Sequence, residues 1–305
     1  MQVNTRAAHD ARTAQMSSLS LQLDRLQASI STEKRINTPD DDPIGAARVL
    51  QINRTLATGA SQQTGVDRAT SRLSSADAAL SGVGALFARA KEISLLGANA
   101  TLNVADRATL AAEVAQLSEQ LLGYANTRDS DGGSLFGGAR TAAAAYAADT
   151  TGAIAYQGAG TAAAAMFDDG AIPTSIDGPR IFAGLPGAAG PTDAFAMLQS
   201  LGSALAEPDP TKRTAALASS QTSLDAAVSR TADVRATIGT RLTRLETEST
   251  RLDASTLRLK TDLATTEGLD MSDAIAHVQR LLTVLQATQL SFAKISSLSL
   301  WDQLR

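Results

Sequence analysis

The stretch MSSLSLQLDRLQASI (residues 16–30) places large apolar side chains at alternating spacings of three and four. The stretch IAHVQRLLTVLQATQLSF (residues 275–292), near the other end of the chain, repeats the pattern. The apolar positions are Met16, Leu19, Leu23, Leu26 and Ile30 in the first stretch, and Ile275, Val278, Leu282, Leu285 and Phe292 in the second. This spacing gathers apolar residues into one seam on one face of a helix, as in a coiled coil. We therefore expect two terminal helices that pack on each other or on other copies.

The composition favours slender helices over a thick globular core. Hydrophobic residues make up 44% of the 305 residues, but aromatic residues only 3%, and thin helix pairs leave little room for rings. The mild net charge of −4 argues against a nucleic-acid-binding surface, which needs a basic excess. The chain has no cysteine, so disulfides, thiolate metal sites and cysteine nucleophiles are excluded.

The sequence also bears on where the protein works. The N-terminus MQVNTR has no apolar stretch after its arginine, so we expect no Sec-type signal peptide. No window approaches the roughly 18 uninterrupted apolar residues of a membrane-spanning helix. Both observations predict synthesis in the cytosol and leave open a secretion route that needs no Sec signal.

Between the terminal seams the chain predicts two very long helices. Pro39 and Pro43 interrupt the first helical pattern, Asp42 is the expected N-cap, and the next helix is expected to run to about Leu96. Asn103 is expected to cap a further helix. A second long pattern follows Pro210 and is interrupted at Gly268. This nearly palindromic order predicts a chain that folds back on itself.

The middle of the chain has a different character. Residues 132–191 are rich in glycine, and short apolar runs at 135–136, 153–156 and 180–182 predict strands. We expect a mainly α fold: a long antiparallel coiled-coil or helical-bundle rod with a small β-containing insert. The expected domains are a terminal coiled coil that is disordered before assembly (1–43 with 266–305), a helical rod (44–131 with 192–265) and a side domain (132–191).

Catalytic chemistry has little support. His9 and His277 are the only histidines, and each lies within a terminal helical pattern. The carboxylates of Asp40, Asp41 and Asp42 could bind a divalent cation, but helix capping within an exposed loop is the favoured interpretation. We therefore expect no enzyme activity, metal or cofactor. Membrane binding is less favoured than self-association, because the polar faces of the terminal helices are not strongly basic.

Three stretches resemble a known family. The stretch STEKRINTPDDDPIGAA (residues 31–47) resembles the N-terminal signature of the bacterial flagellin superfamily, in the form found in its hook–filament junction proteins. Residues 125–138 are similar to the family's passage into its side domain, and LQATQLSFAKISSLSL (residues 285–300) closely resembles the C-terminus of the junction proteins. The resemblance covers both ends and the approach to the insert but not the insert itself, and Glu33 stands where glycine is common in the family.

The resemblance implies a structural role in the bacterial flagellum. Members form a helical ring of copies between hook-associated protein 1 and the flagellin filament, and their terminal helices build an inner tube. They leave the cell unfolded through the flagellar type III apparatus, without a cleaved signal peptide, while a cytoplasmic chaperone holds the C-terminal segment. A short or minor flagellin that polymerises into the filament is the alternative, and an unrelated coiled-coil scaffold is a remote one.

We expect the terminal seams to become ordered on assembly, when neighbouring copies offset the entropy of fixing them. The break between residues 34 and 43 is expected to act as a joint between the terminal helices and the rod. Arg35 and Asp40 to Asp42 are expected to offer polar contacts between subunits at this joint. The residues expected to bind partners are Met16, Leu19, Leu23, Leu26, Ile30, Arg35, Asp40, Asp41, Asp42, Ile275, Val278, Leu282, Leu285, Phe292, Ile295, Leu298 and Leu300. For each residue the alternative is that it only stabilises the monomer.

Overall fold

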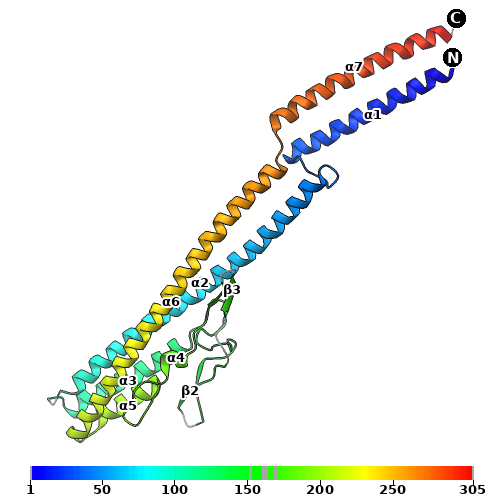
Figure 1. The fold of residues 1–305 in the computed structure, drawn as a ribbon. Helices are drawn as coiled ribbons and strands as arrows, with labels where there is room; N and C mark the ends of the chain where they lie inside the picture. The colour runs from blue at the N-terminus through cyan, green and yellow to red at the C-terminus, as the bar shows by residue number, and fades with distance from the viewer. Residues whose placement is uncertain (1, 100, 151–152, 160–163, 168–169, 304–305) are drawn as a thin grey trace. The chain divides into compact units, whose positions relative to one another are not determined.

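The protein is mainly helical (Figure 1). A computed structural model describes residues 2–99, 101–150, 153–159, 164–167 and 170–303. The chain divides into two compact units: unit 1 comprises Met1–Gly59 and Asp253–Arg305, and unit 2 comprises Ala60–Leu252. The predicted fold class, mainly α with a small β-containing insert, is confirmed. The predicted division into three domains, with ends that order on assembly, stays a prediction.

Unit 1 pairs the two ends of the chain. Helix α1 (Gln2–Thr32) lies antiparallel beside α7 (Met271–Gln303), so that the two termini lie at the same end of the pair (Figure 1). Unit 1 also contains the first turns of α2 (Pro43–Gly97) and the last turns of α6 (Pro210–Glu267). The predicted pairing of the two terminal helices is therefore confirmed.

Unit 2 is a helical bundle built on the rest of α2 and α6. Side chains at three-four spacing on α2 are buried: Val66, Ala69, Leu73, Ala76, Leu80, Val83, Phe87 and Ala90. Three polar contacts tie Gln63 to Ser249, Asp77 to Arg235 and Lys91 to Asp225. Residue numbers rise along α2 as they fall along α6, so the two helices run antiparallel.

Two shorter helices, α3 (Val104–Ala125) and α5 (Ala194–Ala206), complete the bundle and pack against each other. Asn103 caps α3 by accepting a hydrogen bond from the backbone N–H of Asp106 at 2.8 Å, as predicted. Asp193 caps α5 in the same way, accepting from Phe195 at 2.9 Å and Ala196 at 2.8 Å. These caps satisfy backbone donors that have no partner within the helix.

The insert contains two small antiparallel hairpins. Strands β1 (Tyr146–Ala148) and β2 (Ile154–Tyr156) pair with Tyr146 opposite Tyr156. Strands β3 (Ala164–Phe167) and β4 (Gly170–Pro173) pair with Ala164 opposite Pro173.

Two of the predicted strands are wrong. Residues 180–182 lie in a short helix, α4 (Pro179–Phe182), because Pro179 at its first position favours a helical turn. Leu135 and Phe136 are buried but lie outside the strands.

Arginines of the long helices hold the insert in place. Arg72 of α2 pairs with Asp129 and donates to the carbonyl of Ser134 at 2.7 Å. On α6, Arg230 donates to the carbonyls of Ala183 and Gly184, and Arg241 donates to that of Pro173 at 3.3 Å. Burial and the nearby Arg180 lower the pKa of Arg241. The insert is therefore fixed mainly through its backbone oxygens.

We expect Arg72→Ala to lower the free energy of unfolding by about 3 kcal/mol, because it leaves the carboxylate of Asp129, which is 9% exposed, without its partner. Urea unfolding followed by circular dichroism measures the change. Arg89→Ala is the matched control on the same helix: Arg89 is 44% exposed and pairs with Glu92 and Glu113 at the surface, so it should change little. Equal losses in the two variants would contradict a structural role for the Arg72 pair.

Candidate assembly surface

The seam of α1 faces α7. Each of its five predicted residues, Met16 to Ile30, is partly buried, whereas most residues between them are exposed. Across the pair, the His9 ring lies against Phe292 with ring centroids 4.8 Å apart. The predicted seam of the first helix is therefore confirmed as the face that α1 turns toward α7. Its role in assembly stays a prediction.

The seam of α7 differs from the predicted one. Val278, Leu285 and Phe292 face inward as expected, but Ile275 and Leu282 are 47% and 38% exposed. Ala274, which is buried, and Leu281, which is partly buried, take their places. Both patterns share Val278 and Leu285, so spacing alone does not distinguish them. The small side chain of Ala274 allows α1 and α7 to approach closely where the helix pair begins.

The displaced residues form an apolar flank on α7. Met271, Ile275 and Leu282 lie on one side of the helix beside the seam, and all three are exposed. On α1, Leu21 is 59% exposed on the side opposite the seam. The side chains of Ile295, Leu298 and Leu300, also predicted to bind partners, lie outside the described residues.

The joint begins with an unusual residue at the end of α1. Glu33 has a φ of 57°, the left-handed conformation that favours glycine. The N–H of Lys34 bonds to the carbonyl of Ser29 at 3.2 Å, and that of Glu33 bonds to Ile30 at 3.3 Å. This pair of bonds is a Schellman motif, which ends a helix sharply. Glu33 thus occupies a position at which glycine would adopt the backbone conformation without steric cost.

The two segments that enter the terminal pair are bonded to each other. The N–H of Arg35 donates to the carbonyl of Glu267 at 2.7 Å, and the N–H of Leu269 donates to that of Glu33 at 3.2 Å. The ammonium of Lys34 lies 3.0 Å from the carboxylate of Glu267. A Cβ on Gly268 would lie 2.3 Å from the carbonyl oxygen of Ala264, so this position requires glycine.

Side chains of the loop complete the joint. Arg35 donates to the carbonyl of Thr266 at 2.9 Å and to the carboxylate of Asp42 at 3.1 Å. Asp42 caps α2 by accepting from the N–H of Gly45 at 2.9 Å, as predicted, and that bond and Arg35 lower its pKa. Backbone N–H groups of Thr38 and Asn37 lower the pKa of Asp41.

The polar residues predicted to contact other subunits thus divide into two groups. Arg35, Asp41 and Asp42 bind groups of their own chain, and Asp40 is exposed. Any contact of these four residues with other subunits stays a prediction.

Two residues of the joint were not predicted to have a role. The amide of Asn37 donates to the Ser29 hydroxyl at 3.0 Å and accepts from that of Thr32 at 2.7 Å, which ties the loop back to α1. A Cβ on Gly45 would lie 2.5 Å from Cδ1 of the buried Ile36. A glycine in the first turn of a helix is the only local signal of such a close approach.

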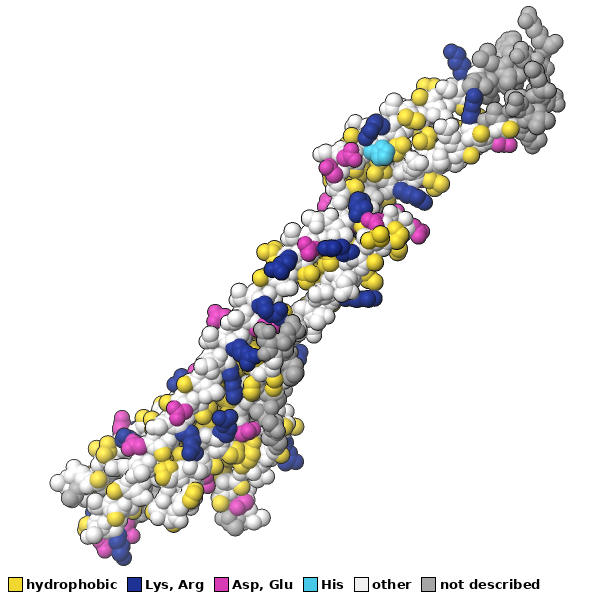
Figure 2. Space-filling model, in the orientation of Figure 1, with side chains coloured by type: hydrophobic (Ala, Val, Ile, Leu, Met, Phe, Trp, Pro, Cys, Tyr) yellow, Lys and Arg dark blue, Asp and Glu magenta, His cyan; other side chains and the backbone are white. Residues whose placement is uncertain are grey.

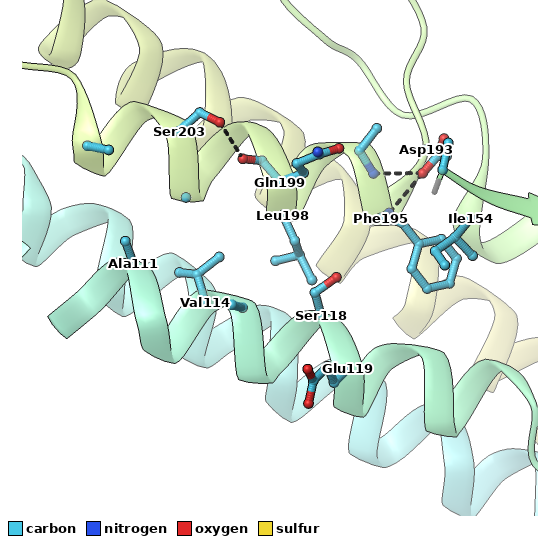
Figure 3. A pocket seen from close by; sticks show the side chains of 15 residues that line it. Ala111, Val114, Ser118, Glu119, Ile154, Asp193, Phe195, Leu198, Gln199 and Ser203 are labelled. Atoms are coloured by element: carbon cyan, nitrogen blue, oxygen red, sulfur yellow. Dashed lines mark hydrogen bonds between the residues drawn. The ribbon is translucent and has the colours of Figure 1, made fainter. Parts of the chain in front are cut away.

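Figure 3 shows a groove of about 610 Å³ in unit 2, between α3 and α5. Val114 and Leu198 line it, Asp193 is used as a helix cap, and Ser203 donates to the carbonyl of Gln199. No nucleophile–base pair lies among its lining residues. Among the described residues, no group of three or more His, Cys, Asp or Glu side chains is placed to hold a metal ion.

The face drawn in Figure 2 shows no single dominant charge. Figure 2 shows basic and acidic side chains interspersed over the face that it draws. Within the described part of the chain, no helix is both long and apolar enough to cross a membrane. Large apolar side chains are exposed on the terminal helices, for example Leu21 and Leu290, and also on the long helices, for example Ile44 and Leu257.

Comparison with known protein families identifies the family to which this chain belongs. The family model of the bacterial flagellin N-terminal helical region matches residues 3–141, and that of the C-terminal helical region matches residues 221–302. The chain belongs to the bacterial flagellin superfamily. The matched regions contain nearly all of α1, all of α2 and α3, most of α6 and nearly all of α7, whereas most of the insert lies between them.

Within the superfamily, the chain is similar to hook-associated protein 3. Flagellar hook-associated protein 3 of Escherichia coli (strain K12) is 28% identical over 90% of both chains. That of Salmonella typhimurium is 25% identical over 99% of both chains. The crystal structure of flagellar hook-associated protein 3 from Legionella pneumophila shares the fold, with a TM-score of 0.63 and 18% identity over 70% of this chain and 98% of that one.

We expect Glu33→Gly to stabilise the joint by about 1 kcal/mol, because glycine adopts the left-handed conformation without the steric cost that a Cβ brings. Slower amide hydrogen exchange at Lys34 and Arg35 would report it. Glu33→Ala removes the carboxylate but keeps the Cβ, so it should leave exchange unchanged. If alanine protects these amides as well as glycine does, the carboxylate and not the backbone is the cause.

Proposed function

We propose that this chain is the structural junction protein of a bacterial flagellum, which joins hook-associated protein 1 at the hook end to the flagellin filament. One observation carries the proposal. The similarity to hook-associated protein 3 runs through 90% or more of both chains, so it includes both terminal helices and the bundle between them. A chain that shared only the terminal helices of the superfamily would match at its two ends alone.

The terminal helices supply the physical basis for assembly. Burying a large apolar side chain contributes on the order of 1.5–3 kcal/mol before entropy is subtracted. Within one copy, α1 and α7 bury their seams only partly and leave Leu21, Ile275 and Leu282 exposed. Neighbouring copies cover these residues when the helices form the wall of an inner tube. The role is structural and involves no catalysis or cofactor.

The partners follow from this position. The protein associates with other components of the flagellum: copies of itself in a helical ring, hook-associated protein 1 and flagellin. An export chaperone holds the C-terminal segment in the cytoplasm. The chain leaves the cell through the flagellar type III apparatus without a cleaved signal peptide and acts outside the cell. The absence of cysteine, which removes any need for oxidative folding, suits this route.

A short or minor flagellin is the second candidate, because flagellins share the paired terminal helices of the superfamily. The purified protein separates the two candidates. A junction protein stays unpolymerised alone and joins filaments only when hook-associated protein 1 and flagellin are present. Long filaments grown from the purified chain alone would favour flagellin. Membership of the superfamily excludes an unrelated coiled-coil scaffold.

Deleting the gene should leave intact hooks without filaments, with flagellin released into the medium, because flagellin would lack the ring on which it polymerises. Electron microscopy of the cells and immunoblotting of the medium measure this. Expression of the full chain from a plasmid should restore the filaments. Normal filaments in the deletion strain would contradict the proposal.

Substituting the exposed flank should block assembly without unfolding the bundle. We expect Leu282→Asp to abolish filament attachment, because it would bury a charge where the tube wall closes. The circular dichroism of the purified variant should stay unchanged, since Leu282 is exposed in the single copy. Leu282→Met keeps an apolar side chain of similar volume and should preserve motility. Equal motility in the two variants would show that this position stays in water.

A further inference from the structure

Two guanidinium groups lie together beside the short helix α4. Arg180 belongs to α4 and Arg241 to α6, and both line one small cavity between these helices. Burial and the charge of Arg180 lower the pKa of Arg241, as expected for two like charges at close range. The other residues that line the cavity are mostly apolar: Ile176, Val234, Thr237 and Ile238.

The bonds of the two arginines leave their charge uncompensated. Arg241 is half-buried and donates to the backbone carbonyls of Pro173 at 3.3 Å and Ser175 at 3.5 Å, which are neutral acceptors. The side chain of Arg180 forms no hydrogen bond or ion pair with any residue that the structure describes. A charge held away from water is normally paired with an opposite one, because the loss of hydration is otherwise costly.

The nearby acidic residues do not supply the opposite charge. Asp177 lies just before α4, but burial and the charge of Asp177 raise the pKa of Tyr156, so this carboxylate lies near the tyrosine. On α6, Asp233 and Glu246 are the acidic residues before and after Arg241, and both are exposed. Across the described ranges of the chain, none of these three carboxylates forms an ion pair with an arginine.

We infer that Arg180 and Arg241 form a binding site for an oxyanion, whose oxygens lie between the two guanidinium groups. Each guanidinium has five N–H donors in a planar fork that matches a carboxylate, sulfate or phosphate group. Arg241 uses only Nη1 for its two carbonyls, so both arginines have donors left. A bound anion also offsets the repulsion between the two charges. The site lies within one copy of the chain, so it does not depend on the proposed function.

Inorganic phosphate tests the site in the purified full-length chain. The midpoint of thermal unfolding is measured as phosphate is added, and sodium chloride at equal ionic strength accounts for screening. We expect a saturable rise with phosphate and none with chloride. Arg180→Gln should need at least tenfold more phosphate for half of that rise, because it removes one guanidinium. Arg140→Gln is the matched control: Arg140 is exposed on the insert and donates to the carbonyl of Gln157, so this variant should respond as the unaltered chain does.

Saturation is the decisive property of the titration. Phosphate also stabilises proteins because it is excluded from their surface, but that effect grows without saturating and is similar in all variants. A rise that does not saturate, or one that Arg180→Gln leaves unchanged, would overturn the inference. If Arg180→Gln fails to fold, Arg180→Lys takes its place, since it keeps the charge but loses the planar fork and should also bind more weakly.

A parallel titration with glutarate identifies the source of the oxyanion. Glutarate presents carboxylates like those of acidic side chains, whereas phosphate is a free tetrahedral anion. Saturation at a lower concentration of glutarate than of phosphate indicates the carboxylate of another protein chain as the natural occupant. The reverse order indicates a phosphate group. Saturation by neither anion would contradict the site.

Discussion

Unit 1 depends on two backbone hydrogen bonds, from Arg35 to Glu267 and from Leu269 to Glu33. They join segments that are more than two hundred residues apart in sequence, and α1 and α7 leave the joint side by side because of them. The sharp end of α1 at Glu33 and the close approach at Gly268 serve this contact. The seams of the terminal helices then meet in a fixed alignment. That alignment determines which apolar side chains of the pair stay exposed and can contact neighbouring copies.

Local chemistry made much of this architecture predictable. Asp42 and Asn103 cap helices where a short polar side chain precedes a helical pattern. The seam of α1 has one continuous three-four alignment, from Met16 to Ile30, and Leu21 stands alone on the opposite side. In α7, two three-four patterns pass through Val278 and Leu285, so only the partner helix distinguishes Leu281 from Leu282. The local sequence therefore does not determine which of these two leucines faces α1.

The insert was less predictable for another reason. Its segments are held by guanidinium groups of Arg72, Arg230 and Arg241 that bond to backbone carbonyls. Every residue has the same backbone carbonyl, whatever its side chain, so no pattern of residue types in the sequence marks these contacts. Asn126 binds the N–H and the carbonyl of Tyr146, both at 2.9 Å, in the same way. Residues 180–182 form a helix because Pro179 favours a turn over an extended strand.

The joint connects the terminal pair to the long helices through two segments of chain, not one. A single flexible linker lets the parts on either side of it swivel about its bonds. Two segments that are bonded to each other, and braced by Arg35 across Thr266 and Asp42, resist such rotation. A turning force applied to the long helices at this point therefore passes to the terminal helices as torque. In the role proposed above, at the junction between hook and filament, every copy needs that property.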